Sequence, residues 1–260
     1  MEDDVRKDDV RILVASHKPY WMPNDPLYVP ICVGAHKNGP IAGFASDAEG
    51  DSIADKNPRY CELTALWWGW RNLDCDALGL VHYRRHFAGS GEKGVLTGPE
   101  ARTLLQRAPV IVPKRRRYYI ESIASHYAHT HDGAHLDSLR ESVRRVSPHR
   151  LDTFDACMRS TSAHMFNMSV MRNEVLHPYC GWLFDVLEDV EGRIDLTEAS
   201  AFQERCIGRL GELLLDVWLR SEDVAYVELA VRELEGRNLF KRGTSFLAAK
   251  FFGKPYDKSF

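Results

Sequence analysis

A short apolar run that ends in charged residues is the feature that most constrains how this chain folds. Residues 77–81 (ALGLV) are continuously apolar, and residues 82–86 (HYRRH) follow without an intervening turn residue. A strand buried on both faces of a parallel sheet has this continuous apolar pattern. Ligands of open α/β sheets bind just beyond the carboxyl ends of such strands. The sequence therefore predicts an anionic ligand here, such as a phosphate or diphosphate; a strand that merely emerges into solvent is the alternative.

Apolar runs typical of strands alternate with segments of helical periodicity along the chain. The predicted strands cover residues 11–15, 28–34, 77–81, 110–113, 166–171 and 225–229, and the predicted helices cover 60–72, 99–106, 120–131, 136–146, 173–187 and 201–219. This alternation predicts an α/β domain with a mostly parallel central sheet. We expect that domain to span residues 10–237, after a disordered segment 1–9 and before a basic and aromatic extension 238–260.

Composition narrows the class of protein. The 260 residues carry a formal net charge of -3, which gives no reason to expect a nucleic-acid partner. The six cysteines form no CxxC pair, which favours free thiols in a reducing compartment. No run of about eighteen apolar residues is available to span a bilayer, and the acidic start is unlike a signal peptide. We therefore expect a cytoplasmic protein. The absence of GxSxG, GxGxxG and P-loop motifs argues against hydrolases, dehydrogenases and kinases.

Polar side chains cluster at or near the ends of the predicted strands. The clusters are His17-Lys18, residues 82–85, His164 with Asn167, and Gln203-Glu204-Arg205. Strand ends that converge in this way build the nucleotide pocket of doubly wound sheets. Together the clusters predict a nucleotide or sugar-nucleotide site.

The two adjacent arginines suit phosphate recognition, because each presents a planar fork of donors. Continued as a strand, the chain would place Tyr83 and Arg85 on one face of the sheet and His82 and Arg84 on the other. We therefore expect one arginine to face the ligand, whereas the other pairs with a carboxylate.

A group of histidines between residues 126 and 135 resembles a set of metal ligands. His131 and His135 are four residues apart, a spacing that zinc ligands use on helices. Gly133 lies between them and no HExxH pattern is present, so a structural role is favoured over metal binding. Tyr119 and His126, with neighbouring tyrosines, are alternatively predicted to form an aromatic wall for a sugar ring.

Several motifs together resemble a family of bacterial glycosyltransferases found among capsular and exopolysaccharide biosynthesis proteins. They are ILVASHKP, KNPRYCELTALWWGW, LGLVHYRRHF, HYAHTH, HMFNM, FQERCIGRLGELLLDVWL and KFFGKPYDKSF. The resemblance runs from about residue 11 to residue 260. It implies a glycosyltransferase-A-type fold, a single Rossmann-like domain that binds a nucleoside-diphosphate sugar. Some relatives resemble galactofuranosyltransferases that use UDP-galactofuranose and form a β linkage.

One departure from the pattern of that fold concerns the metal. Transferases of this type commonly carry Asp-x-Asp after the central strand, where a divalent cation bridges the diphosphate. Here the corresponding strand ends in His82-Tyr83-Arg84, which offers no carboxylate pair for a hard cation. Arginine would then neutralise the leaving UDP directly, and no cofactor would be required. The alternative is Mn²⁺ or Mg²⁺ held by His82 and a distant carboxylate.

The resemblance also implies roles for individual residues. His82, Tyr83, Arg84 and Arg85 would bind the diphosphate, with His17 and Lys18 beside the nucleotide. His164, Asn167, Gln203 and Arg205 would contact the sugar or the acceptor, Asn167 from a strand 165–168. Glu204, or else Asp195, would be the base that deprotonates the acceptor, although Glu204 alternatively only caps its helix.

These inferences predict an inverting transferase that moves a hexose from a UDP-sugar to a surface glycan or lipid-linked glycan. The basic and aromatic extension 238–260 suits a peripheral contact at the inner face of the membrane; packing onto the main domain is the alternative. A sugar-binding or scaffold subunit that has lost catalysis is the rival function, because Asp-x-Asp is missing.

Overall fold

The computed structural model describes residues 8–235, so the predicted extension 238–260 lies outside the described residues, as does most of the predicted segment 1–9. Of that segment, Asp8 forms an ion pair with Arg172 at 2.7 Å, and the Asp9 N–H donates to Asp76 Oδ2 at 2.7 Å. Within residues 8–235, no helix is long and apolar enough to cross a membrane.

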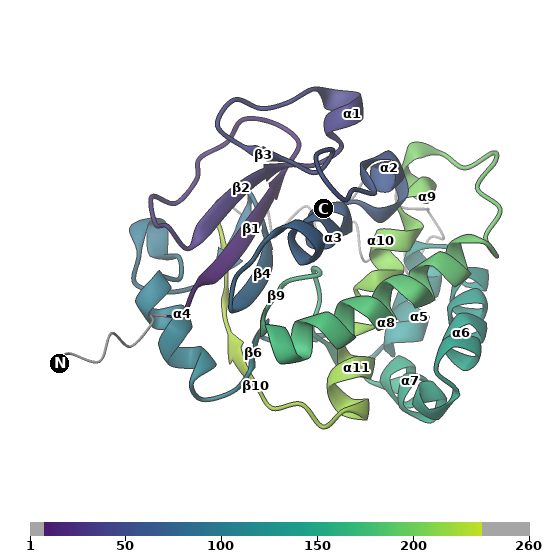
Figure 1. Ribbon diagram of the computed structural model, residues 1–260. Helices are drawn as coiled ribbons and strands as arrows, with labels where there is room; N and C mark the ends of the chain where they lie inside the picture. The colour runs from purple at the N-terminus through teal and green to yellow at the C-terminus, as the bar shows by residue number, and fades with distance from the viewer. Residues whose placement is uncertain (1–7, 236–260) are drawn as a thin grey trace.

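A central β-sheet with strand order β10-β6-β9-β4-β1-β2-β3 organises the chain (Figure 1). Its strands are β1 (Val10–Ser16), β2 (Tyr28–Cys32), β3 (Ala45–Ser46), β4 (Ala77–His82), β6 (Val110–Pro113), β9 (Ser169–Arg172) and β10 (Tyr226–Leu229). Strand β1 is parallel to β2 and β4, β2 to β3, and β6 to β10, whereas β9 is antiparallel to both of its neighbours. The predicted α/β class with a mostly parallel sheet is confirmed.

Further short strands pair outside this strand order. Strand β5 (Arg85–Phe87) pairs antiparallel with β4 and with β11 (Val231–Glu233). Strand β7 (Arg116–Arg117) pairs antiparallel with β8 (Ser162–Ala163).

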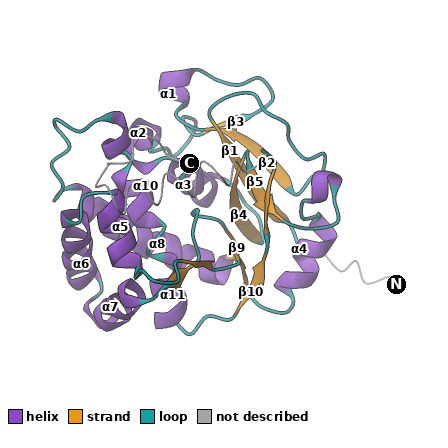
Figure 2. Cartoon of the chain, turned by 180° about the vertical axis from the view of Figure 1, so that it is seen from behind, coloured by secondary structure: helices purple, strands orange, loops and turns teal. Residues whose placement is uncertain are grey.

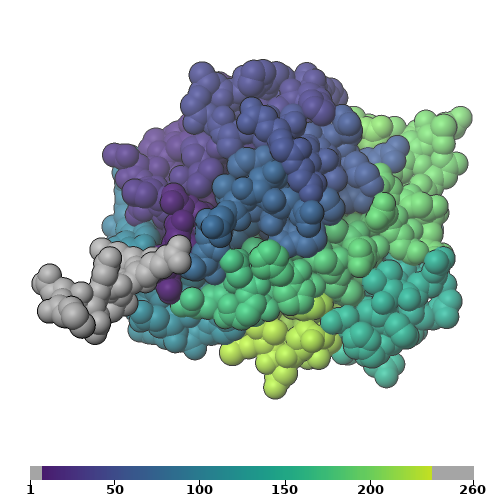
Figure 3. Space-filling model, viewed as in Figure 1, coloured from purple at the N-terminus to yellow at the C-terminus, as the bar shows by residue number. Residues whose placement is uncertain are grey.

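Helices cover both faces of the sheet. They are α1 (Ala35–Asn38), α2 (Asn57–Tyr60), α3 (Leu63–Asn72), α4 (Gly98–Leu105), α5 (Ile123–Thr130), α6 (Ala134–Val146), α7 (Leu151–Arg159), α8 (Asn173–Glu191), α9 (Ala201–Glu204), α10 (Cys206–Gly211) and α11 (Leu215–Ser221). Seen from behind, α4 lies on one side of the sheet and most other helices lie on the other (Figure 2). In the space-filling view, the amino-terminal region and the long helix α8 share one continuous surface (Figure 3).

Alternation along the strands explains this layering. In β1, Leu13 and Ala15 belong to the core beneath α3 and α8, whereas Ile12 and Val14 belong to the core beneath α4. Side chains of successive strand residues point to opposite faces, so a strand covered on both faces is apolar throughout. Helix α3 lies close to the sheet at Gly69, where a Cβ atom would come within 2.5 Å of Leu13 Cδ1.

Three predicted elements are corrected. The helix predicted over 60–72 is divided at Cys61, whose φ of 54° is left-handed. The helix predicted over 201–219 is divided into α9, α10 and α11. The strand predicted from residue 166 begins only at residue 169, because Phe166 and Asn167 also have left-handed backbones, with φ of 80° and 51°. These residues form a turn rather than a strand, and the turn faces the site described next.

Candidate active site

A cavity of about 720 Å³ opens beyond the carboxyl ends of β1 and β4, where Ala15, His17 and His82 contribute to its wall. Residues of α2, α5, α9 and α10 line the other walls. Its volume lies within the range of about 300–1,000 Å³ that small-molecule sites occupy. The cavity is therefore located where ligands of open α/β sheets bind.

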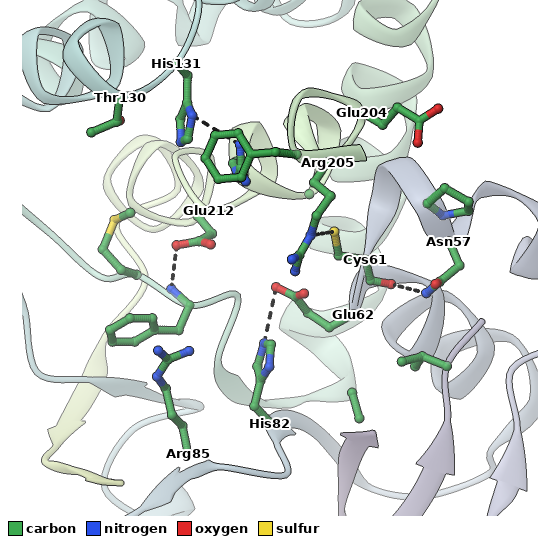
Figure 4. Close-up of a pocket in the computed structure, with 18 of the residues that line it drawn as sticks. Asn57, Cys61, Glu62, His82, Arg85, Thr130, His131, Glu204, Arg205 and Glu212 are labelled. Atoms are coloured by element: carbon green, nitrogen blue, oxygen red, sulfur yellow. Dashed lines mark hydrogen bonds and ion pairs between the residues drawn. The ribbon is translucent and has the colours of Figure 1, made fainter. Parts of the chain in front are cut away.

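A tight hairpin between β4 and β5 gives the sheet side of the cavity its charge. His82 pairs directly with Arg85 across the hairpin, and Tyr83 and Arg84 form the turn. Directly paired residues share a face of a sheet, and both side chains point toward the cavity (Figure 4). The predicted alternation, with His82 and Arg85 on opposite faces, is therefore wrong, because the chain reverses direction after His82.

The two turn residues have a different environment. Tyr83 is buried, and the Arg84 guanidinium lies 5.2 Å from the centre of its ring. Arg84 is exposed and lies 3.5 Å from a carboxylate oxygen of Glu235. Arg85 Nε also lies 3.7 Å from a carboxylate oxygen, that of Glu233, so both arginines have a carboxylate partner, whereas one was expected. Both turn residues still contribute to the cavity wall.

Glu62 lies at the start of α3 and is held as a carboxylate. Its Oε1 lies 3.3 Å from His82 Nε2 and accepts a hydrogen bond from Asn167 Nδ2 at 2.7 Å. Burial raises the pKa of Glu62, but the charge and hydrogen bond of His82, with the Asn167 bond, outweigh it and lower the pKa to about 2. The Asn167 side chain therefore stabilises the Glu62 carboxylate, and its Nδ2 also donates to the Gly208 carbonyl at 2.9 Å.

Arg205 enters the cavity from the junction of α9 and α10. Its Nε donates to Cys61 Sγ at 3.3 Å, and its guanidinium points toward Glu62 (Figure 4). Burial raises the pKa of the Cys61 thiol to about 11, so the sulfur is neutral. Among residues 8–235, no carboxylate lies within ion-pair distance of Arg205. Within the described residues, the guanidinium thus lies at the cavity wall without a direct carboxylate partner.

Glu212 is a second carboxylate deep in the cavity wall. Its Oε2 accepts a hydrogen bond from the Phe166 N–H at 2.9 Å. This N–H belongs to the left-handed turn at residues 166 and 167. Burial raises its pKa, and the charge of Glu62 raises it further. The Arg85 guanidinium lies 4.8 Å from the centre of the Phe166 ring. Two neighbouring carboxyl groups thus have pKa values shifted in opposite directions, as acid–base sites often do.

The helical wall carries a further cation and an aromatic ring. Arg209 Nη1 lies 3.1 Å from His131 Nδ1, and its guanidinium lies 3.9 Å from the centre of the Phe202 ring. Burial lowers the pKa of His131 to about 3, helped by the charge of Arg209, so the imidazole is neutral and accepts this hydrogen bond.

The cavity brings together eight of the residues that were predicted from the sequence. They are His17, His82, Tyr83, Arg84, Arg85, His126, Glu204 and Arg205.

The remaining predicted residues lie outside the cavity wall. Lys18 lies 5.4 Å from the ring centre of Tyr83, and Gln203 caps α9 by accepting the Ser200 N–H at 2.9 Å. Asp195 accepts the Thr197 N–H in the loop after α8, and Tyr119 is exposed to solvent.

His164 is part of a separate cluster of ionisable residues. Its side chain is fully buried, with Nδ1 2.6 Å from Asp216 Oδ1 and Nε2 2.8 Å from Glu228 Oε1. Arg115 completes the cluster with two hydrogen bonds to Asp216, at 3.0 and 3.1 Å. We call these four residues the His164 cluster.

The histidines that resembled metal ligands have protein partners. His126 and His129 lie 3.2 and 3.0 Å from the two carboxylate oxygens of Glu121, and His135 lies 3.3 Å from the Tyr127 hydroxyl. Over residues 8–235, no three His, Cys, Asp or Glu side chains are grouped as metal ligands.

Sequence reasoning missed Glu62, Glu212 and Arg209. Each lies in a segment whose apolar neighbours indicate a core helix, CELTALWW for the first and IGRLGELLL for the other two. The signal that was present is a charged residue at the boundary of an apolar helical stripe.

A solved structure shares the fold of this chain. The apo structure of the bifunctional glycosyltransferase WbbM matches with a TM-score of 0.80 and 24% identity, over 88% of this chain and 46% of that one. The chain therefore shares the fold of the matched part of the WbbM chain, which is consistent with the expected glycosyltransferase-A type. This chain spans less than half the length of the WbbM chain.

Residues 11–223 match the family model described as a domain of unknown function (DUF4422). The chain belongs to this family. No curated protein matches it.

Proposed function

We propose that the protein is a glycosyltransferase that moves a hexosyl group from a UDP-sugar to a hydroxyl of a glycan. The observation that carries the proposal is the convergence of cationic side chains and two carboxylates on one cavity at the carboxyl ends of the parallel strands. The shared fold with WbbM supports the same class of reaction.

Arg85 and Arg205 are the groups that we propose for the diphosphate. They approach from the hairpin and from the start of α10, on either side of His82 (Figure 4). Positive charge held in place before the reaction stabilises the negative charge that develops on the leaving UDP. His17 and Arg84 would border the nucleotide from the cavity rim, which retains the predicted role of this strand end. Lys18 is proposed only as an outer contact.

Glu212 is the base that we propose for an inverting displacement. The acceptor oxygen attacks the anomeric carbon, its proton passes to the carboxylate, and the bond to UDP breaks. A base works best when its pKa lies near the working pH, and burial raises the pKa of Glu212. Glu62 is less suited, because its pKa is lowered to about 2. Glu204 lines the cavity and is the alternative base, whereas Asp195 lies outside it.

The donor is proposed to be UDP-galactofuranose, forming a β linkage to a surface polysaccharide. This narrower assignment rests on the motif resemblance. The reaction is proposed to require no metal, with Mn²⁺ or Mg²⁺ bound through His82 as the alternative.

The proposal is tested by measuring UDP release from a panel of UDP-sugars with and without a glycan acceptor, each with and without EDTA. We expect acceptor-dependent release that EDTA leaves unchanged. Loss of release in EDTA would establish the metal-bound alternative. Binding of a UDP-sugar without release under every condition would favour the scaffold subunit instead.

Matched variants test the base. Glu212→Gln should lower kcat by about 10²- to 10⁴-fold, the usual contribution of general base catalysis, and should retain UDP binding. Asp195→Asn should keep full activity. If Glu204→Gln loses activity and Glu212→Gln keeps it, the base is Glu204.

A further inference from the structure

An exposed segment beside the cavity mouth carries apolar and cationic side chains together. Tyr119 is 81% exposed and Ile120 is 76% exposed, and the third large hydrophobic residue exposed among residues 8–235, Tyr226, is only 36% exposed. Lys114, Arg116 and Arg117 precede them and are also exposed. We call residues 114–120 the rim segment. Exposed apolar side chains that are grouped rather than scattered mark interaction surfaces.

The rim segment is held firmly at the cavity. Its strand β7 pairs with β8, and the Tyr118 N–H donates to the Thr161 carbonyl at 2.8 Å. Arg116 and Tyr118 line the cavity itself. Tyr119 has a left-handed φ of 58°, and the Ile120 N–H bonds back to the Tyr118 carbonyl at 2.7 Å. This tight turn exposes two consecutive side chains to solvent beside the cavity mouth.

The charges of the rim segment favour an anionic occupant. Among the described residues, no carboxylate lies within ion-pair distance of Lys114, Arg116 or Arg117. Glu121, the next acidic residue along the chain, is buried and contacts His126 and His129 instead. Within residues 8–235, the three exposed cations are thus not neutralised by neighbouring acidic side chains.

We propose that the rim segment docks on an anionic lipid bilayer, with Tyr119 and Ile120 inserted at the headgroup level. Apolar side chains beside cations are typical of interfacial anchors, and each cation near an anionic bilayer strengthens binding. A folded protein partner is disfavoured, because stable interfaces bury upwards of about 1,000 Å², whereas only two large apolar side chains of the rim segment are exposed. A nucleic acid would contact the cations and stack on Tyr119, but it would gain little from Ile120.

Docking through this segment would turn the cavity mouth toward the membrane surface. An acceptor anchored in that membrane would then reach the cavity without leaving the bilayer. This consequence rests on the proposed function, whereas the membrane contact itself does not.

The proposal is tested by flotation of the full chain with vesicles of phosphatidylcholine, with and without phosphatidylglycerol. We expect binding only to the anionic vesicles. Arg116→Gln/Arg117→Gln should weaken it about thirtyfold, since each cation near the surface contributes roughly fivefold. Tyr119→Ser/Ile120→Ser should weaken it by about tenfold, through the loss of inserted apolar surface.

The matched charge control is Arg102→Gln/Arg107→Gln. Arg102 lies on α4, and Arg107 lies just before the opposite end of β6 from the rim segment. This control should bind as the unchanged protein does, and thermal unfolding of each variant verifies that it is folded. Binding of both rim variants at the unchanged level would overturn the proposal, as would absence of binding by the unchanged protein. Loss in the arginine variant alone, with equal loss of heparin binding, would identify a polyanion surface instead.

The vesicle measurement needs no catalytic turnover. A protein that binds vesicles but never releases UDP would contradict the proposed function and leave the membrane contact established. A protein that releases UDP but does not bind vesicles would contradict the membrane contact and leave the proposed function standing.

Discussion

The cavity and the His164 cluster contain the same kinds of side chain but differ in how completely these are paired. In the His164 cluster, both ring nitrogens of His164 contact carboxylates, and Arg115 binds Asp216 with two hydrogen bonds. In the cavity, Arg205 donates to a neutral thiol and Glu212 accepts a backbone N–H. Buried charges that neutralise one another hold the fold together, whereas charges with unused capacity are available to a ligand.

This difference explains why His164 differs from the prediction. The sequence favoured a sugar contact because His164 lies near a strand end, as His82 does. Its partners Asp216 and Glu228 are 52 and 64 residues away along the chain. Nothing local indicates that they occupy both ring nitrogens.

The largest expected effect is on the His164 cluster. Asp216→Asn should lower the free energy of unfolding at pH 7 by about 3–5 kcal/mol, because the buried His164 loses the carboxylate at Nδ1 and Arg115 loses both hydrogen bonds to that carboxylate. Burial raises the pKa of Asp216, but bonding to His164 and the Arg115 charge bring it below 3.8. The stabilisation is therefore present above pH 3.8 and is lost as the pH falls through that lowered value.

Urea denaturation measures this effect, with Glu228→Gln as the control. The Glu228 side chain is 36% exposed, against 5% for Asp216, so its loss should cost about 1 kcal/mol or less. An equal loss of unfolding free energy in the two variants would contradict the view that Asp216, as the buried partner of His164 and Arg115, stabilises the fold more than Glu228 does.

A smaller effect is expected when a cavity charge is removed. Arg205→Gln should weaken UDP binding by about 10- to 100-fold, the scale of a hydrogen bond to a charged group, and should leave the free energy of unfolding within about 1 kcal/mol. Calorimetric titration with UDP measures the first quantity. Arg140→Gln is the control, because Arg140 pairs with Asp155 on the exposed surface. The same UDP affinity in both variants would place the diphosphate away from Arg205.

The smallest effect has the opposite sign to that of Asp216→Asn. Because the pKa of Glu212 is raised above 4.5, its contribution to stability is present below that pH and is lost as the pH rises through the raised value. Glu212→Gln should therefore stabilise the protein at pH 7 by about 1 kcal/mol, the scale of a typical substitution. The gain should vanish below pH 4.5. Denaturation at several pH values measures it, and Glu204→Gln, which alters a half-buried side chain of the cavity wall, should show no such trend. A loss of stability at pH 7 would mean that Glu212 is already paired.

Much of the fold could be predicted, since continuous apolar runs are local signals. Strand β6 has the predicted bounds, and β4 extends the predicted strand by one residue. The hairpin after β4 could not be predicted, because Tyr83 and Arg84 are not typical turn residues. That single turn decides which side chains share a face of the sheet. Without it, Arg85 was predicted on the face opposite to His82, whereas the two residues are paired on the same face.

Cavity residues that follow strand ends were predicted, as were His126, Glu204 and Arg205 on or between helices, whereas the carboxylates within apolar helical segments were missed. His82 and Arg85 belong to the first group. Glu62 and Glu212 belong to the missed group, because their contacts depend on left-handed turns at Cys61 and Phe166 that neither residue type favours. Backbone geometry of this kind arises from tertiary packing and carries little signal in one sequence.

The pairing of β5 with β11 links the site to the part of the chain that follows α11. Glu233 pairs with Arg85 across the two strands, and the Leu234 N–H donates to the Arg84 carbonyl at 2.9 Å. Shortening the chain to the end of α11 would therefore remove strand β11, whose pairing with β5 orients Arg85. Truncation from the carboxyl terminus is therefore expected to disturb the site as soon as it removes β11, although every described helix that lines the cavity would still be present.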